Sequence, residues 1–312
     1  MRMKNLSKLP LLGVLVVAPL APGRLLAQPP ANPPLQLFFT DAGTGTVDEY
    51  AIPSGTFSTY ASGLGFAAGI VANPAGGFLV ASSFNTADQI SQVVNGVASP
   101  YVTLGNVSGA FGLAVNPQNN NLYAGNYFNN APVQQITPAP AKTVSTYTLN
   151  TTNAQGLAFD GNGNLYVSEF YAGDVIKITP GGVSSVFASG LSTPEGLAFD
   201  NSGNLYVANF GGNDIIKVPS SGGTGSVYYS GALVNKPNGL AVDGNGNVYV
   251  TSQGFGAGNN TVAEIYSGGL SGLTLVNGLN NPEFITIVPE PSAPALLAAG
   301  AAGLLLRRRR QA

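Results

Sequence analysis

The chain has 312 residues, of which 44% are apolar and only 8% are charged, and it contains 42 glycines and 22 prolines. Surface helices need charged residues on their solvent face, so this composition favours short strands joined by many turns. The absence of cysteine and histidine excludes disulfides, thiol nucleophiles, Ser-His-Asp triads and histidine-ligated zinc or iron.

Residues 1–27 have the features of a secretory signal. Three basic residues precede the apolar run LPLLGVLVVAPLAP, and Ala27 offers a small residue for cleavage, although Leu25 is an imperfect match at the third position back. The run is too short and too interrupted by proline for a membrane span. We expect removal of residues 1–27 and a linker over 28–36, and an ordinary buried helix is the alternative.

A sequence unit of just over 40 residues recurs along the body of the chain. GLAFDGNGNLYVSEF at 156–170 returns as GLAFDNSGNLYVANF at 196–210 and as GLAVDGNGNVYVTSQ at 239–253. The repeat glycines are spaced by 43, 44, 40 and 43 residues, a period typical of propeller blades. These glycines are Gly69, Gly112, Gly156, Gly196 and Gly239.

Each unit predicts a four-stranded antiparallel meander. GLAFD and NLYVSEF have the β-branched and aromatic character of strands, and DVIKITP and VSSVFASG follow them. Asp160, Asp200 and Asp243 begin the Asn- and Gly-rich hairpins that follow the first strands. The repeat glycine fits the crowded axis of a propeller, where the innermost strands converge.

The two ends of the repeat region complement each other. LFFTD, TVDEYAI and FSTYASG match the second, third and fourth strands of a unit, whereas NPEFITIV matches only a first strand. A solenoid also stacks repeats, but these ends together complete one blade and so favour a closed circle. We therefore predict an all-β, six-bladed propeller over residues 37–288, with its first blade formed by Leu37–Gly63 and Asn281–Val288.

The NLYV[AS] run resembles that of NHL-repeat propellers, and the resemblance spans nearly the whole body. It implies the same six-bladed geometry. NHL repeats also carry an arginine shortly after the second strand, where this chain has Gly, Asn or Ala.

The end of the chain reads VPEPSAPALLAAGAAGLLLRRRRQA. As a helix, residues 295–306 would extend about 18 Å, which is short for a hydrocarbon core of about 30 Å. The opening VPEP, the apolar stretch and the arginine cluster resemble a PEP-CTERM sorting tail over residues 289–312. That resemblance implies transient membrane anchoring, cleavage by an exosortase-type protease and release to the surface or matrix of a Gram-negative bacterium. A plain tail anchor is the alternative. The sorting residues are Pro289, Glu290, Pro291, Arg307, Arg308, Arg309 and Arg310.

The predicted topology gathers polar residues at one face. The residues before the repeat glycines and those that end the second strands should surround the channel there. The first set is Ala68, Phe111, Gln155, Glu195, Asn238 and Glu283, and the second is Asp41, Ser82, Asn126, Glu169, Asn209 and Ser252.

Carboxylate and amide oxygens are the ligands that Ca²⁺ prefers. The sequence therefore predicts a candidate Ca²⁺ site at Glu195 and Asn238, supported by Glu169 and Asn209. Glu283, Asp41 and Gln155 are expected nearby. The alternative is that these oxygens cap loop amides, as Asn and Asp often do near turns.

PEGLAFD at 194–200 and PNGLAVD at 237–243 resemble segments of the gluconolactonase/regucalcin propellers. In that family Glu, two Asn and Asp hold a divalent cation, each just before such a glycine. The order of residues around this circle does not reproduce that set, and only Asn238 matches a family ligand. The resemblance implies a metal-dependent lactonase in which the cation polarises a carbonyl, as the alternative to a protein without catalytic residues.

Aromatic residues follow the second strands beside the polar face. Aromatic faces beside amides and carboxylates suit a neutral sugar, and packing between blades is the alternative. These residues are Tyr127, Phe128, Phe170, Tyr171, Phe210 and Phe255.

Without its two ends the body retains four lysines and thirteen acidic residues, a net charge of −9. It has no basic surface for phosphates, which argues against nucleic acid or an anionic bilayer as its partner. We expect an exported protein with a non-catalytic binding or structural role, whose partners are the processing protease and exopolysaccharide or another surface protein.

Overall fold

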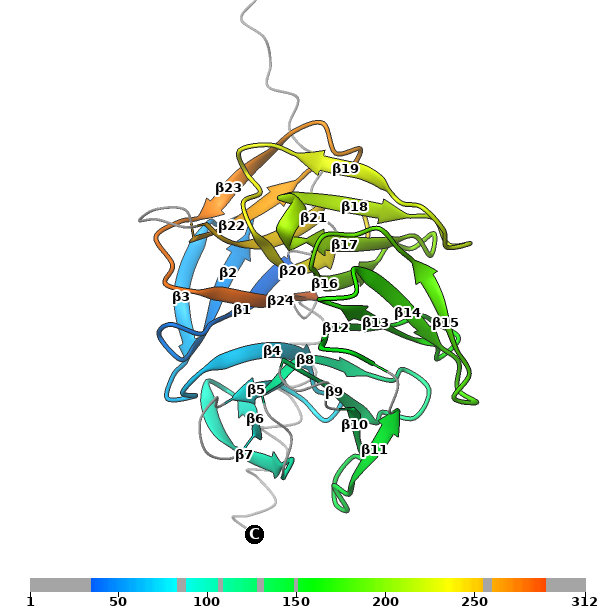
Figure 1. The fold of residues 1–312 in the computed structure, drawn as a ribbon. Helices are drawn as coiled ribbons and strands as arrows, with labels where there is room; N and C mark the ends of the chain where they lie inside the picture. The colour runs from blue at the N-terminus through cyan, green and yellow to red at the C-terminus, as the bar shows by residue number, and fades with distance from the viewer. Residues whose placement is uncertain are drawn as a thin grey trace, which may run out of the picture. The chain divides into compact units, whose positions relative to one another are not determined.

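The computed structural model describes residues 35–82, 88–105, 109–127, 132–148, 151–254 and 260–289. These residues form six four-stranded antiparallel sheets and one short 3₁₀ turn, Phe210–Gly212 (Figure 1). No helix in these ranges is long and apolar enough to cross a membrane. The predicted all-β, six-bladed propeller of four-stranded blades is confirmed.

The strands follow the predicted meanders. Blade 1 contains β1 (Leu35–Asp41), β2 (Thr46–Ile52), β3 (Thr56–Ala61) and β24 (Pro282–Pro289); blade 2 contains β4 (Ala67–Ala72), β5 (Phe78–Ser82), β6 (Gln89–Val94) and β7 (Val97–Thr103); blade 3 contains β8 (Ala110–Val115), β9 (Leu122–Asn126), β10 (Val133–Ile136) and β11 (Val144–Thr148). Blade 4 contains β12 (Ala154–Phe159), β13 (Leu165–Glu169), β14 (Asp174–Ile178) and β15 (Ser184–Ala188); blade 5 contains β16 (Pro194–Phe199), β17 (Leu205–Asn209), β18 (Asp214–Val218) and β19 (Ser226–Ser230); blade 6 contains β20 (Pro237–Val242), β21 (Val248–Gln253), β22 (Asn260–Ile265) and β23 (Gly272–Val276).

Blade 1 joins the two ends of the repeat region. β24 pairs antiparallel with β1, with Leu35 opposite Pro289 and Phe39 opposite Ile285, and the sheet continues through β2 and β3. Each innermost strand packs against the next, and β20 packs against β24. The blades therefore close into a circle through the predicted combination of three early strands and one late strand.

The turns between first and second strands lie at the opposite face from the predicted polar circle. The Asp160 carboxylate accepts hydrogen bonds from the backbone amides of Asn162 and Asn164, both at 2.9 Å, and from the Asn164 side chain at 2.7 Å. Asp200 and Asp243 repeat this arrangement. The predicted turn-forming role of these aspartates is confirmed.

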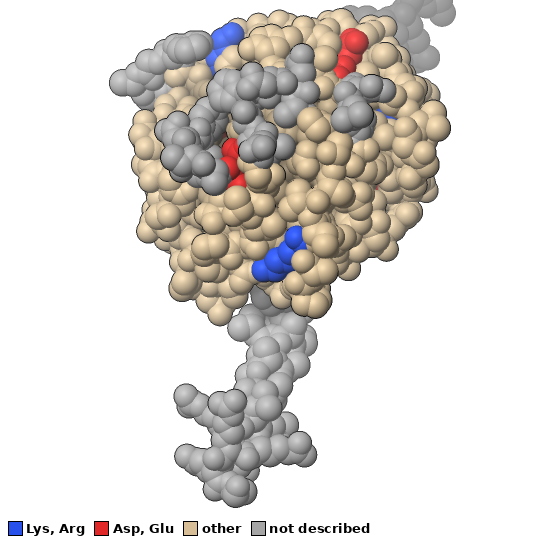
Figure 2. Space-filling view, turned by 60° about the horizontal axis from the view of Figure 1, so that its bottom comes forward, with Lys and Arg blue, Asp and Glu red and all other residues tan. Residues whose placement is uncertain are grey.

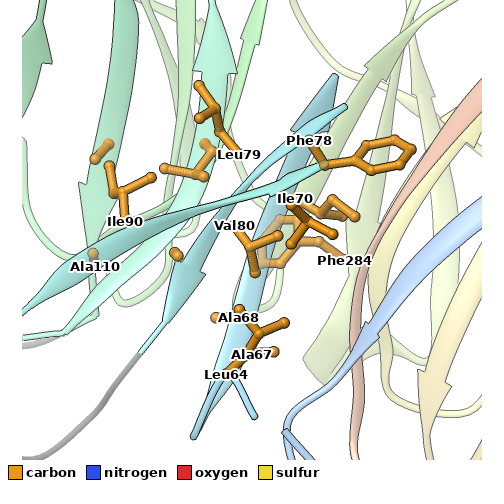
Figure 3. Close-up of a cluster of buried hydrophobic side chains, with 14 of the residues drawn as sticks. Leu64, Ala67, Ala68, Ile70, Phe78, Leu79, Val80, Ile90, Ala110 and Phe284 are labelled. Carbon is orange, nitrogen blue, oxygen red and sulfur yellow. The ribbon is translucent and has the colours of Figure 1, made fainter. Parts of the chain in front are cut away.

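Apolar side chains pack mainly between neighbouring blades. Figure 3 shows one such cluster, in which Ile70 of β4 and Val80 of β5 lie with Phe284 of β24. The tyrosine of the NLYV run contributes at other blade interfaces, where Tyr166 packs edge-on against Phe199 with ring centroids 4.9 Å apart. Burial of this surface between blades supplies most of the driving force for stacking them.

The repeat glycine is required by the distance between innermost strands. A Cβ atom on Gly156 would overlap the backbone carbonyl oxygen of Glu195 in the next blade. The same overlap arises at the other four repeat glycines. The predicted role of this glycine at the crowded axis is confirmed, although blade 1 has Phe284 at the corresponding position.

Charged side chains are sparse on the surface in view (Figure 2). Each lysine of the described residues lies over an aromatic ring, with ammonium-to-centroid distances from 4.2 Å for Lys142 over Tyr101 to 5.5 Å for Lys177 over Tyr166. Lys217 also pairs with Asp200 at 3.2 Å. The few cations are therefore held locally against the protein rather than gathered into a basic patch.

Candidate functional site

Two concentric sets of side chains surround the channel where the innermost strands begin. The inner circle is the second residue of each innermost strand: Ala68, Phe111, Gln155, Glu195, Asn238 and Glu283. The outer circle is the last residue of each second strand or, in blade 6, the last but one: Asp41, Ser82, Asn126, Glu169, Asn209 and Ser252. All twelve residues are buried.

The outer circle holds the loops of its face in place. Asp41 accepts hydrogen bonds from four backbone amides, including those of Asn280 at 2.8 Å and Asn281 at 2.9 Å. Glu169 accepts from the Thr152 amide at 2.7 Å, and Asn209 accepts from the Ser192 amide at 2.6 Å. These contacts match the loop-capping alternative that the sequence left open for Glu169, Asn209 and Asp41.

The inner circle presents oxygens without protein partners. Gln155 Oε1, Glu195 Oε2 and Asn238 Oδ1 are buried and accept no hydrogen bond within the described residues. The Asn238 amide nitrogen donates to Glu283 Oε2 at 2.5 Å, and the Asn281 side chain donates to Glu283 Oε1 at 2.7 Å. We call Gln155, Glu195, Asn238 and Glu283 the polar mouth.

Hydroxyl groups of the second strands position both carboxyl residues of the polar mouth. Ser168 accepts from the Gly156 amide at 2.7 Å and donates to the Glu195 backbone carbonyl at 2.7 Å. Thr251 accepts from the Gly239 amide at 2.7 Å and donates to the Glu283 carbonyl. Each hydroxyl thus ties the innermost strand of its own blade to that of the next.

Charge interactions link Glu195, Glu283 and Tyr127. Burial, reinforced by the charge of Glu283, raises the pKa of Glu195 well above its usual value. Burial raises the pKa of Glu283 to about 8 despite its hydrogen bonds to Asn238, Gln253 and Asn281. Burial raises the pKa of Tyr127 from blade 3, and the charges of Glu195 and Glu283 add to that rise. Groups from blades 1, 3 and 5 therefore act on one another.

An aromatic wall lies beside the polar mouth. The Phe111 ring packs against Tyr127 with centroids 5.0 Å apart and edge-on against Phe284 at 5.3 Å. We call Phe111, Tyr127 and Phe284 the aromatic wall. Phe111 is almost fully buried, whereas Tyr127 is half-buried.

The other predicted aromatic residues form a second group. Phe170 lies 5.0 Å from Tyr171 and 6.3 Å from Phe210 between ring centroids, and the Lys236 ammonium lies 5.0 Å from the Phe210 ring. Tyr171 is 73% exposed, so its ring is open to solvent. Phe128 and Phe255 lie outside the described residues.

The structure separates the predicted ligands into two kinds. Glu195 and Asn238 join Gln155 and Glu283 in the polar mouth, while Glu169, Asn209 and Asp41 bind loop amides. No group of three or more Asp and Glu side chains suited to a metal ion is found in the described ranges. Pro289 ends β24, and the other sorting residues, Glu290, Pro291, Arg307, Arg308, Arg309 and Arg310, lie outside those ranges.

The contacts of Asn281, Ser168 and Thr251 were not predicted from the sequence. A signal for the two hydroxyls was present, because Ser and Thr occupy the same position of the repeat, directly after NLYV or NVYV. Asn281 directly precedes Pro282, and the corresponding residues of two other units are Thr193 and Lys236, so no recurring side chain marked it.

Comparisons with known proteins agree with the fold. A family model for a β-propeller repeat matches residues 225–254. No curated protein matches the chain. The solved structure of a nidogen/laminin complex is similar with a TM-score of 0.65 and 14% identity, over 81% of this chain and 98% of that one.

Two solved structures concern enzymes. A catalytically inactive histidine-to-alanine variant of virginiamycin B lyase from Staphylococcus aureus, with quinupristin, has a TM-score of 0.60 and 17% identity, over 83% of this chain and 92% of that one. A protein assigned as a gluconolactonase has a TM-score of 0.57 and 19% identity, over 71% of this chain and 80% of that one. At these identities the likeness shows the propeller fold alone.

Proposed function

We propose that this protein is exported to the surface or matrix of a Gram-negative bacterium and binds a ligand at the polar mouth without catalysing a reaction. The observation that carries the binding role is the set of three buried, unpartnered oxygens on consecutive blades, beside an aromatic wall. An unsatisfied buried acceptor costs about 1–3 kcal/mol, so a guest that donates hydrogen bonds there recovers a substantial free energy.

The sequence supports export. Residues 1–27 read as a secretory signal and residues 289–312 as a sorting tail, which would bring the protein to an exosortase-type protease and then to exopolysaccharide. A single blade carries both ends of the described chain, because Leu35 pairs with Pro289. The first and last described residues therefore lie side by side in blade 1.

The absence of histidine weighs against one enzymatic role. The virginiamycin B lyase variant that is catalytically inactive carries alanine in place of histidine, and this chain has no histidine to supply. A lyase reaction that depends on that side chain has no counterpart here.

Binding to purified exopolysaccharide and to a panel of neutral and amino sugars tests the proposal. We expect saturable binding by the full chain that Glu195→Gln and Tyr127→Ala each weaken about tenfold, since each removes a contact at the mouth. Glu264→Gln and Tyr229→Ala, which alter blades 6 and 5 away from the mouth, serve as matched controls. Absence of binding to every glycan would refute the sugar-binding role.

A divalent-metal-dependent hydrolase related to the gluconolactonases is the second candidate. Glu195, Asn238 and Gln155 offer three oxygens, and a cation bound there would polarise a substrate carbonyl. Ca²⁺ takes about six to eight oxygen ligands, so the remainder would have to come from water or substrate. Glu169 and Asn209 fit less well because their oxygens already accept loop amides.

Lactone hydrolysis distinguishes this candidate from the first. A hydrolase of this kind loses its activity with a chelator and with Glu195→Gln, and regains the chelator-sensitive part when Ca²⁺ is returned. Full-chain protein that binds glycans but hydrolyses no lactone supports the non-catalytic role.

A further inference from the structure

The unpartnered atoms of the polar mouth need hydrogen-bond donors. Its three unpartnered atoms, Gln155 Oε1, Glu195 Oε2 and Asn238 Oδ1, are all acceptors. Their side chains are 1%, 4% and 1% exposed, so bulk solvent does not satisfy them. A guest suited to this site must therefore donate, and a guest that only accepts hydrogen bonds is excluded.

Neighbouring residues fix this polarity. Asn238 donates its amide nitrogen to Glu283 and so must present its oxygen on the other side. Asn281 donates its amide nitrogen to the second oxygen of the same carboxyl. Both of these amide nitrogens are thus used on Glu283, whereas the three acceptors of blades 4, 5 and 6 have no partner among the described residues.

The carboxyl groups and the aromatic wall indicate which class of ligand fits the polar mouth. Burial and the charge of Glu283 disfavour ionisation of Glu195, and a cationic guest nearby would offset this cost and stabilise the ionised carboxylate. A divalent ion would need oxygens of water or substrate in addition to the three that the inner circle leaves free. A protonated primary amine has three N–H donors for three acceptors, and an aromatic face attracts a cation by about 0.5–2 kcal/mol.

We infer that the polar mouth binds the protonated primary amino group of an organic ligand, with Gln155, Glu195 and Asn238 accepting its three N–H bonds. The aromatic wall, through Tyr127 and Phe111, contacts the carbon body of that ligand. This inference rests on the proposed ligand-binding role of the mouth and adds the chemical class of the ligand.

Isothermal titration of the purified full chain with matched probes tests the inference. The probes are benzylamine and methylamine, then benzyl alcohol, benzyltrimethylammonium and CaCl₂. Benzylamine is expected to bind at least about tenfold more tightly than benzyl alcohol, which lacks the charge, and benzyltrimethylammonium, which lacks N–H donors. Methylamine is expected to bind more weakly than benzylamine because it has no ring for the aromatic wall.

Variants connect the binding to named atoms. Glu195→Gln and Asn238→Leu are each expected to weaken benzylamine binding about tenfold or more. Glu264→Gln, which alters a buried carboxyl of blade 6 that binds Tyr249, is expected to leave it unchanged. Circular dichroism melts of all three variants show whether a loss of binding reflects misfolding. Glu195→Asp is a further variant that keeps the carboxyl group, and its benzylamine binding can be compared with that of Glu195→Gln.

The possible outcomes separate this inference from the proposed function. Equal binding of benzylamine, benzyl alcohol and benzyltrimethylammonium overturns the amine assignment but keeps a ligand-binding mouth. Binding of CaCl₂ that Glu195→Gln abolishes, without amine binding, also overturns it and favours the metal-dependent alternative. If neither amine binds at millimolar concentration while glycans do, the amine assignment is wrong and the proposed function stands.

Discussion

Glu195 and Glu283 belong to the same type of position yet have different surroundings. Both are the second residue of an innermost strand, and both are almost fully buried. Glu283 accepts hydrogen bonds from Asn238 and Asn281, whereas one oxygen of Glu195 has no partner. Burial raises the pKa of both carboxyl groups, and their mutual repulsion adds to the rise at Glu195, so the folded state favours their protonated forms.

The raised pKa of Glu283 predicts how the free energy of unfolding depends on pH. The folded pKa of Glu283 is about 8, against an unfolded value of 4.5, so its contribution to stability is fully present below pH 4.5 and is lost as the pH rises to 8. We expect the unfolding free energy to fall across this window by an amount on the order of a few kcal/mol. Glu283→Gln, which cannot ionise, should flatten the dependence.

Denaturant unfolding of the wild-type protein and of Glu283→Gln at several pH values measures this pH dependence. Glu264→Gln is the comparison, because it changes another buried glutamate whose pKa is also raised. A wild-type protein that gains stability from pH 4.5 to pH 8 would show that Glu283 is not buried in its protonated form.

The same residue type also marks the limit of sequence-based prediction at this scale. Glu169 and Glu195 were both predicted as candidate ligands, but Glu169 caps the Thr152 amide while Glu195 keeps a free oxygen. The sequence showed that these residues share one face. It did not show the loop conformation, which determines which carboxylate oxygen accepts a hydrogen bond from a backbone amide.

At the scale of elements, the innermost strand carries the strictest constraints. Its glycine allows the next blade's carbonyl to approach, and the hydroxyl of the neighbouring second strand bridges the two blades. Glycine was predictable because it recurs with the repeat, and the Asp160-type turns were predictable from local chemistry. The Ser168 and Thr251 hydroxyls link neighbouring blades, so the sequence of a single repeat does not predict these hydrogen bonds.

A pair of glycine substitutions tests this constraint. Gly156→Ala should destabilise the protein by about 1–3 kcal/mol, because its methyl group would overlap the Glu195 carbonyl. Gly161→Ala is the matched control, since a Cβ there meets nothing within 4 Å. Chemical unfolding measures both, and equal stability of the two variants would contradict the proposed packing.

At the scale of the whole molecule, circle closure brings the site together. β24 carries Glu283 and Phe284, and it reaches the polar mouth only because it pairs with β1. The closure was predictable since NPEFITIV supplied the one strand that the first blade lacked. The segment before residue 35 was interpreted from its basic residues and apolar run, and the segment after residue 289 from its resemblance to a sorting tail. Their roles in export belong to the proposed function.

Truncation at two points tests the role of closure. Removal of residues 282–312 deletes β24 and should abolish the cooperative thermal transition, because β1, β4 and β20 lose their partner. Removal of residues 290–312 leaves β24 intact and should preserve that transition. Similar melting of both truncated proteins would mean that the circle does not depend on β24.

A high-resolution crystal structure of the full chain with benzylamine tests the central claim most directly. We expect electron density for the amine nitrogen within hydrogen-bond distance of Gln155 Oε1, Glu195 Oε2 and Asn238 Oδ1, with the benzylamine ring against Tyr127. The contrary result is a polar mouth in which these three oxygens accept hydrogen bonds from other groups of the chain and leave no room for a ligand.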